Sequence, residues 1–420
     1  MSVPRQYIVR FISLADQVVF SAATFLLMIM LARYYSEVEL AGYGIGLSIA
    51  LTLQGVLRNC YVIQNSIILP RILRNLTSKV LGQQTFIWGI LLIVELAVLT
   101  MVLFFNGNSF YGAIVISTIA CSLIYAQLDF DRIMLIKHEK YWSSFIASAL
   151  YLTLNIILFF AIPQYNISFY MVMLILGVYA FLKFICLLFA LGLPNLFWGW
   201  RLIKRDFKKH FISSISGSMG YFGHNHMPLI FLGFFAAPIQ TAAFVAMRGL
   251  MQPLLVIVRS LDIIDKNLFQ LITADNDDKV AGMREVLIRQ ILIYGLLAFG
   301  VILFVTAFGD TIIQLVYGAK YAAYSHILTG WALVYFILAI SFPLETMIVK
   351  LDKLKTYNFY RLAAGAIGAI LAVFLCGPYG ALGAVIACFV GFLVSIVCAL
   401  WVVRDVLFWK NNELALNTVN

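Results

Sequence analysis

The chain has 420 residues, of which 63% are hydrophobic and only 11% are charged, and its mean hydropathy is +0.97. Soluble globular domains carry about a quarter charged residues, so this composition excludes that class and indicates a membrane protein. The formal charge is +10, from 29 Lys and Arg against 19 Asp and Glu. Most of these basic residues lie in clusters between apolar stretches, which indicates membrane orientation and argues against nucleic acid as a partner.

The apolar stretches predict about twelve membrane-spanning helices. Residues 143–182, for example, contain no Asp, Glu, Lys, Arg or His. Backbone groups find no water in the hydrocarbon core, so stretches of this length must cross it as helices. The predicted fold class is therefore an all-α polytopic membrane protein. Its predicted spans are residues 11–33, 40–63, 83–105, 110–130, 143–162, 167–191, 211–235, 240–262, 286–308, 324–349, 358–377 and 380–403.

Basic residues predict the orientation of these spans. With the N-terminus inside, nearly all Lys and Arg outside the spans fall on the cytoplasmic face, and only Arg33 and Lys320 fall on the other face. The positive-inside rule therefore predicts that both termini are cytoplasmic. We expect no cleavable signal peptide, because the first apolar stretch is long and contains Asp16.

The segment LPNLFWGWRLIKRDFKKH divides the chain into halves of six spans each. We predict an N-terminal bundle at residues 1–192, a cytoplasmic basic linker at 193–210, a C-terminal bundle at 211–404 and a cytoplasmic tail at 405–420. The aromatic and basic residues of the linker suit contact with anionic lipid headgroups. A simple positive-inside linker is an equally good interpretation.

Polar residues in the first three spans are candidates for a transport path. Gln17 lies on a polar face of the first span with Asp16 beside it, and Gln54 and Arg58 share a face of the second. Glu95 is about midway through the third span. A protonatable carboxylate at that depth suits H⁺ or Na⁺ coupling, for which Glu95 and Asp16 are candidates. For Glu95, a neutral hydrogen-bonded packing role is an equal alternative.

The first half of the seventh span is unusually polar. It is rich in Ser and Gly and ends in His224, Asn225 and His226, followed by Pro228. Such a helix must face protein or water. Small-residue packing explains the Ser and Gly positions, whereas a cavity explains the three polar residues better. We predict no metal site, because helical positions two apart point about 200° away from each other and no third ligand is apparent.

The eighth span places Arg248, Gln252 and Arg259 on one helical face. Arg248 lies about 12 Å from the outer end, close to mid-bilayer. A cation there costs at least about 2.5–3.5 kcal/mol, so it should face the bundle interior or water, where a guanidinium suits phosphate. The alternative is a structural ion pair, for example with Glu95. For Arg259, nearer the inner surface, snorkelling to the headgroups is the better interpretation.

Catalytic motifs are absent from the sequence. It contains no P-loop, no H-E-x-x-H and no G-x-S-x-G, which argues against an enzyme. Asp129 and Asp131 form a D-x-D at an inner helix end, but no soluble domain surrounds it. The six cysteines lie in predicted helices without C-x-x-C spacing, so they are read as apolar packing residues. No cofactor is expected.

Four segments together resemble a known family. They are residues 14–70, with ADQVVFSAATFLLMIMLARYYSEVELAGYGIGLSIAL, then LGFFAAPIQTAAFVAMRGLMQPL at 232–254, LVYGAKY at 315–321 and PYGALGAVIA at 378–387. Their order and spacing resemble the Wzx-like O-antigen and exopolysaccharide flippases. These are polysaccharide transporters of the multidrug/oligosaccharidyl-lipid/polysaccharide (MOP) superfamily, and the resemblance extends over almost the whole chain.

The resemblance implies two six-helix bundles in a V, as in MATE transporters, around a cavity lined by helices one, two, seven and eight. The implied activity is translocation of an undecaprenyl-pyrophosphate-linked oligosaccharide across the bacterial inner membrane by alternating access, for O-antigen, capsule or exopolysaccharide biosynthesis. Implied partners are this lipid-linked oligosaccharide, membrane lipids, a polysaccharide polymerase and export machinery. From their depth in the membrane and their helical face, we predict these substrate-binding or cavity residues: Arg248, Arg58, Gln252, Arg259, His224, Asn225, Gln17 and Gln54.

Two other functions remain open at this stage. One is a cation-coupled multidrug or small-molecule exporter of the same fold. The other is a membrane-embedded sugar or lipid transferase, against which the short outer loops argue, because such enzymes need loops large enough to cover a reaction.

Overall fold

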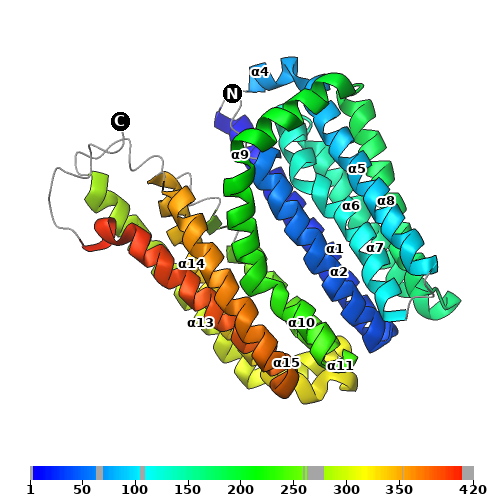
Figure 1. The fold of residues 1–420 in the computed structure, drawn as a ribbon, viewed down its shortest axis with the longest axis vertical. Coiled ribbons are helices and arrows are strands. Elements are labelled where there is room, and N and C mark those ends of the chain that lie inside the picture. Colours follow the sequence, from blue (N-terminus) through cyan, green and yellow to red (C-terminus); the bar gives the residue numbers. More distant parts are fainter. Residues whose placement is uncertain are drawn as a thin grey trace. The chain divides into compact units, whose positions relative to one another are not determined.

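The structure is a computed structural model that describes residues 3–62, 70–104, 109–258, 261–262, 279–351 and 353–408. These residues are almost entirely helical and include no β-strand, which confirms the all-α class (Figure 1). The elements are α1 Val3–Tyr34, α2 Glu37–Leu57, the π-helical η1 Arg58–Val62, α4 Pro70–Asn75, α5 Thr77–Phe104, α6 Ser109–Lys137, α7 Tyr141–Tyr165, α8 Phe169–Leu191, α9 Leu196–Asn225, α10 Met227–Phe235, α11 Pro238–Leu250, α13 Lys279–Tyr317, the 3₁₀ turn η2 Ala319–Tyr324, α14 Ser325–Lys350 and α15 Leu354–Phe408.

Ten helices in the described residues are long and apolar enough to cross a membrane. The last of them, Leu354–Arg404, contains two predicted spans, because Gly380 with φ 54° and ψ −133° interrupts its helical backbone. The predicted span 211–235 is not among the ten, since α9 ends at Asn225 and α10 begins at Met227. These two interruptions account for the difference between ten helices and about twelve predicted spans.

Local sequence signals fix the ends of several helices. Ser36 caps α2 in a capping box: its side chain accepts from the Glu39 N–H, and the Glu39 carboxylate accepts from the Ser36 N–H at 2.9 Å. Ser168 caps α8 through its side chain alone, which accepts from the Met171 N–H at 3.3 Å. Between α7 and α8, Asn166 adopts the left-handed conformation with φ 50°. These short turns join α1 to α2 and α7 to α8.

The chain divides into two compact units. Unit 1 comprises Met1–Ser218 and Ala237–Ala246, and unit 2 comprises Met219–Ala236 and Met247–Asn420. The predicted linker 193–210 is helical from Leu196 onward, as the start of the 30-residue α9. The division into bundles at 1–192 and 211–404, a linker at 193–210 and a tail at 405–420 stays a prediction.

Buried ion pairs on α6 tie the helices of unit 1 together. Arg132 Nε lies 2.7 Å from Asp16 Oδ2 of α1, and Lys183 Nζ of α8 lies 2.9 Å from Asp131 Oδ2. The Gln127 amide of α6 donates to the Ala180 carbonyl of α8 at 2.9 Å. Charges in an apolar interior are tolerated when they are paired, so these contacts specify which helices neighbour α6.

In unit 2 the polar half of the seventh predicted span packs closely on α15 through glycines. A Cβ atom at Gly223 would lie 2.5 Å from the Gly365 carbonyl oxygen, and one at Gly220 would lie 2.6 Å from the Arg361 carbonyl. Small residues allow helix backbones to approach this closely in membranes. The Gly positions of the seventh span therefore serve helix packing.

Candidate functional site

Arg248 lies near the end of α11 with its side chain half-buried. Its Nη2 donates to Asn225 Oδ1 at 3.1 Å, and its Nη1 donates to the Asn225 carbonyl oxygen at 3.4 Å. The guanidinium carbon also lies 5.3 Å from the ring centroid of Trp331 on α14. An amide and an aromatic face thus hold the guanidinium from two different helices.

The hydrogen bonds of the Asn225 side chain determine which ring nitrogen of His226 carries the proton. Arg248 can only donate, so the Asn225 amide oxygen faces it and the amide nitrogen faces His226 Nε2 at 3.2 Å. His226 Nε2 must then accept, which assigns a neutral imidazole with its proton on Nδ1. That Nδ1 is buried and has no hydrogen-bond partner in the described part of the chain.

Both helices that meet at this contact are interrupted there. His226 is the turn between α9 and α10, and Pro228 near the start of α10 supplies no N–H to the preceding turn. A turn at Met251 ends α11 three residues after Arg248, and helix resumes at residues 252–258. Interrupted helices expose backbone polar groups within the membrane, a feature typical of binding sites in transporters. Here the Asn225 carbonyl at such an interruption accepts from Arg248.

The charge of Arg248 sets it apart from other cations within the helices. Among the described residues, no carboxylate pairs with Arg248, whereas Arg132 pairs with Asp16, and Arg361 pairs with Glu345 at 3.2 Å. The suggested pair between Arg248 and Glu95 stays untested, because the Glu95 side chain lies outside the described residues. Among the described residues, Arg248 is therefore held by neutral groups, and no carboxylate there offsets its charge.

His224 is fully buried on the other side of the helix interruption. Its Cβ occupies space left by Gly368 and Gly391 of α15, and its ring packs on Phe392 with centroids 4.4 Å apart. No group of three His, Cys, Asp or Glu residues that would suit a metal ion occurs in the ranges described above. The role of His224 in a substrate path stays a prediction.

In unit 1, Arg58 begins the π-helical turn η1, and its side chain is 59% exposed. Its Nε lies 3.6 Å from Asp129 Oδ2, which also accepts from Gln54 Nε2 at 3.1 Å. Arg58 and Gln54 therefore converge on one carboxylate, as their shared helical face allows. Because the Arg58 side chain is exposed and its ion pair with Asp129 is 3.6 Å long, this contact restrains Arg58 only weakly.

The remaining predicted residues are placed as follows. The Asp16 carboxylate is buried and accepts from Arg132, from Ser144 at 3.2 Å and from Ser148, an arrangement that satisfies a charge within packed helices. Gln17 and Gln252 are half-buried, and Arg259 lies outside the described residues. The substrate or ion-coupling roles of all of these residues stay predictions.

Two contributors to these contacts are missing from the sequence prediction. Trp331 stacks on Arg248, but nothing in span 324–349 distinguishes it from a packing aromatic. In the sequence Asp129 stands out only as part of a D-x-D motif, whereas in the structure it pairs with Arg58, and Asp131 pairs with Lys183. The sequence shows a cation within one predicted span and an acid at the end of another, but it does not show which cation pairs with which acid.

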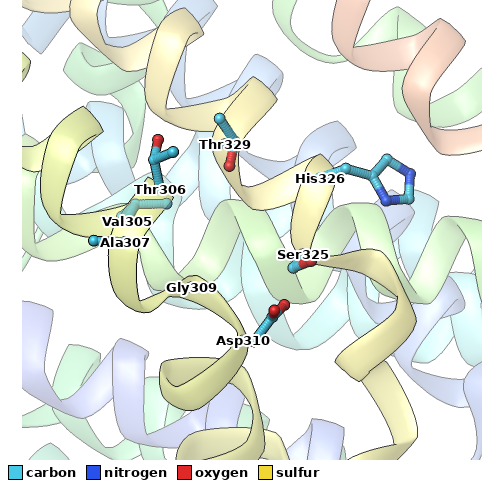
Figure 2. A pocket seen from close by; sticks show the side chains of 8 residues that line it. All are labelled: Val305, Thr306, Ala307, Gly309, Asp310, Ser325, His326 and Thr329. Carbon is cyan, nitrogen blue, oxygen red and sulfur yellow. The ribbon is translucent and has the colours of Figure 1, made fainter.

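A separate small pocket lies in unit 2 where α13 meets the start of α14 (Figure 2). It has a volume of about 160 Å³ and is lined by Val305, Thr306, Ala307, Gly309, Asp310, Ser325, His326 and Thr329. Figure 2 shows the Asp310 carboxylate directed toward Ser325 and the His326 ring turned away from it. None of the predicted site residues lines this pocket, and its volume is far below that of an oligosaccharide.

Comparison with solved structures identifies the fold. The chain is similar to the lipid II flippase MurJ in an inward closed conformation, with a TM-score of 0.67, 13% identity, and coverage of 99% of this chain and 94% of that chain. It is also similar to the eukaryotic MATE transporter AtDTX14, with a TM-score of 0.64, 13% identity, and coverage of 99% and 98%. An inward-facing multidrug resistance MATE family transporter of the MOP superfamily matches with a TM-score of 0.58, 13% identity, and coverage of 98% and 96%.

The chain has the fold of MurJ and the MATE transporters. No protein-family model and no curated protein sequence matches it. With ten helices able to cross a membrane, it is a multi-pass membrane protein. At 13% identity the similarity establishes the fold, so the activity must be argued from the residues of the site.

Proposed function

We propose that the protein is a flippase for an undecaprenyl-pyrophosphate-linked oligosaccharide in a bacterial inner membrane. The observation that carries this proposal is Arg248, a cation in a membrane-spanning helix that no described carboxylate neutralises. Keeping such a charge in the membrane costs at least about 2.5–3.5 kcal/mol. An anionic substrate that binds there offsets this cost and gives the charge a function.

The geometry of the guanidinium favours a phosphate ligand. Two of its N–H groups point to Asn225, and its flat face lies over Trp331. The remaining N–H donors lie in the same plane, which suits bidentate binding of phosphate oxygens. A pyrophosphate carries several such oxygens on one headgroup, so it fits better than a single neutral sugar.

The similarity in fold is consistent with this substrate class. The match covers 94% of the chain of MurJ, which is a lipid II flippase. In our proposal the lipid-linked oligosaccharide moves from the inner to the outer leaflet by alternating access and is then passed to a polymerase. H⁺ or Na⁺ coupling through Asp16 or Glu95 belongs to the same proposal.

A complementation experiment tests the proposal. A strain that lacks the protein should accumulate the lipid-linked intermediate, and wild-type protein should clear it and restore polymer export. Arg248→Ala should express normally and fail to restore export, while Arg248→Lys should restore it in part, because Lys keeps the charge without bidentate geometry. Arg289→Ala, which removes an exposed arginine of α13, is the matched control and should behave as wild type. Full export by Arg248→Ala would contradict the proposal.

A cation-coupled exporter of small molecules is the second candidate, because MATE transporters share the fold. The two functions differ in what the cell retains. An exporter lowers the steady-state level of a cationic dye in the cytoplasm, and an uncompensated Arg248 disfavours binding of such a dye. We therefore expect dye accumulation to be the same with and without the protein.

A further inference from the structure

The first half of α9, residues 196–208, is fixed to unit 1 by one face. Gly199, Ile203 and Asp206 are buried at helical spacing of four and three residues. A side chain at Gly199 would collide with the Gly82 backbone of α5, so the two helices touch at glycines. Gln83 Nε2 of α5 donates to Asp206 Oδ2 at 3.1 Å. This part of α9 is therefore a docked helix rather than a loose linker.

The N-terminal end of this helix is anchored as well. The Asn195 N–H donates to the Ser78 carbonyl at 2.7 Å, and the Asn195 side chain accepts from the Trp198 N–H at 3.2 Å. Phe86 of α5 packs on Trp200 with ring centroids 5.0 Å apart. In Figure 1 the first turns of α9 lie at the end of unit 1 where α4 and the N-terminus also lie.

The opposite face of the helix is exposed, aromatic and basic. Phe197, Arg201, Lys204 and Lys208 follow one another at spacings of four, three and four, and all are exposed, Phe197 to 63%. The Arg201 guanidinium lies 4.4 Å from the Phe197 ring centroid, and Lys204 Nζ lies 4.9 Å from that of Trp200. Aromatic rings thus surround the cations on the surface, an arrangement typical of the boundary between headgroups and hydrocarbon.

The charge on this face is of one sign. Asp206 is the only acidic residue between 196 and 210, and it is buried against Gln83, with Arg205 Nε 2.8 Å away. Lys79 of α5 adds a further cation, 4.5 Å from the Trp198 ring centroid. The exposed face therefore offers positive charge beside large apolar rings, and the single acidic residue of segment 196–210 lies on the opposite, buried face.

We infer that the face formed by Phe197, Arg201, Lys204 and Lys208 binds the headgroups of anionic phospholipids while its aromatic rings enter the headgroup region. An anionic lipid matches both properties, because its phosphate pairs with the cations and its acyl chains meet the rings. A soluble anion matches only the first. The inference does not depend on the proposed substrate, which binds elsewhere through Arg248.

Lipid titration of the purified protein tests this inference. Wild-type protein in a neutral detergent would be titrated with phosphatidylglycerol and, separately, phosphatidylcholine, and bound lipid would be counted by native mass spectrometry. Each cation near an anionic lipid surface is worth about fivefold in affinity. The variant Arg201→Gln/Lys204→Gln/Lys208→Gln should therefore bind phosphatidylglycerol at least about tenfold more weakly, while phosphatidylcholine binding stays unchanged.

A matched control removes the same charge from elsewhere. Arg284→Gln/Lys350→Gln/Lys355→Gln also loses three exposed cations, and it should bind phosphatidylglycerol within about twofold of wild type. If the first triple variant is unfolded, Lys204→Gln/Lys208→Gln keeps the ring contacts of Arg201 and should still lose about fivefold or more. Equal losses in both triple variants, equal affinity for the two lipids, or displacement of the lipid by equimolar inorganic phosphate would each overturn the inference.

Discussion

Asn225→Asp tests the candidate site most directly, because it supplies a carboxylate counter-ion that Arg248 does not have among the described residues. The substitution is nearly isosteric and places a carboxylate oxygen where Asn225 Oδ1 now accepts from Arg248 Nη2 at 3.1 Å. The second carboxylate oxygen then faces His226 Nε2, now 3.2 Å from the amide nitrogen. The imidazole satisfies it by moving its proton from Nδ1 to Nε2. The variant should therefore fold.

The expected effect on transport follows from the charge. Two unit charges about 3–4 Å apart interact by about 4–5.5 kcal/mol at an effective dielectric constant of 20. Screening and desolvation reduce the net effect, and charge pairs measured in protein interfaces give about 1.5–7 kcal/mol. If the new carboxylate weakens pyrophosphate binding by about 3 kcal/mol, transport at low substrate concentration falls about 100-fold.

The assay compares three forms of the protein at matched expression: wild type, Asn225→Asp and Asn225→Ala. Asn225→Ala removes the side-chain hydrogen bonds to Arg248 and His226 but keeps the backbone carbonyl that accepts from Arg248. It adds no carboxylate beside Arg248, so it should transport better than Asn225→Asp and be less stable than that variant. Thermal unfolding in detergent separates the two effects, since Asn225→Asp should unfold at or above the wild-type temperature. Wild-type transport by a well-folded Asn225→Asp protein would refute the reasoning that Arg248 must be uncompensated to function.

Two further predictions concern packing and charge in the two units. Gly223→Ala places a methyl group 2.5 Å from the Gly365 carbonyl oxygen and should cost about 1–3 kcal/mol of stability, whereas Gly295→Ala, with no atom within 4 Å, should be neutral or stabilising in the same thermal-unfolding assay. Asp131→Asn leaves the Lys183 charge without its partner at 2.9 Å and should cost about 3–5 kcal/mol, while the double variant Asp131→Leu/Lys183→Met should cost clearly less. Equal unfolding temperatures for the two glycine variants, or a double variant less stable than Asp131→Asn, would contradict these assignments.

The membrane-spanning helices are predictable from the sequence, because a long apolar stretch can satisfy its backbone hydrogen bonds in the hydrocarbon core only as a helix. The interruption near His226 was also signalled, by Pro228 two residues later. The helical start of α9 was missed as a structural element, although Gly199, Ile203 and Asp206 repeat at helical spacing within the predicted linker. For the basic residues around them the sequence offers two interpretations, membrane orientation and contact with anionic lipid headgroups.

The partners of charged residues were not predictable, because they depend on how the helices are arranged. Depth and helical face single out Arg248 in the sequence, but its contact with Asn225 joins two helices that are both interrupted at that level. Nothing in the sequence specifies that Asp129 meets Arg58 while Asp131, two residues later, meets Lys183. Successive positions of a helix point in different directions, so neighbouring acids serve different neighbouring helices.

The central claim is that Arg248 carries the charge needed to move a pyrophosphate-linked lipid across the bilayer. The most direct measurement is transbilayer movement of an undecaprenyl-pyrophosphate-linked oligosaccharide in proteoliposomes, followed by the accessibility of the sugar to an external enzyme. The account predicts rapid exposure of the inner-leaflet sugar with wild-type protein, and exposure no faster than in protein-free liposomes with Arg248→Ala. Equal rates for wild type and a folded Arg248→Ala protein would contradict it. So would the absence of any transbilayer movement of the lipid-linked oligosaccharide with folded wild-type protein.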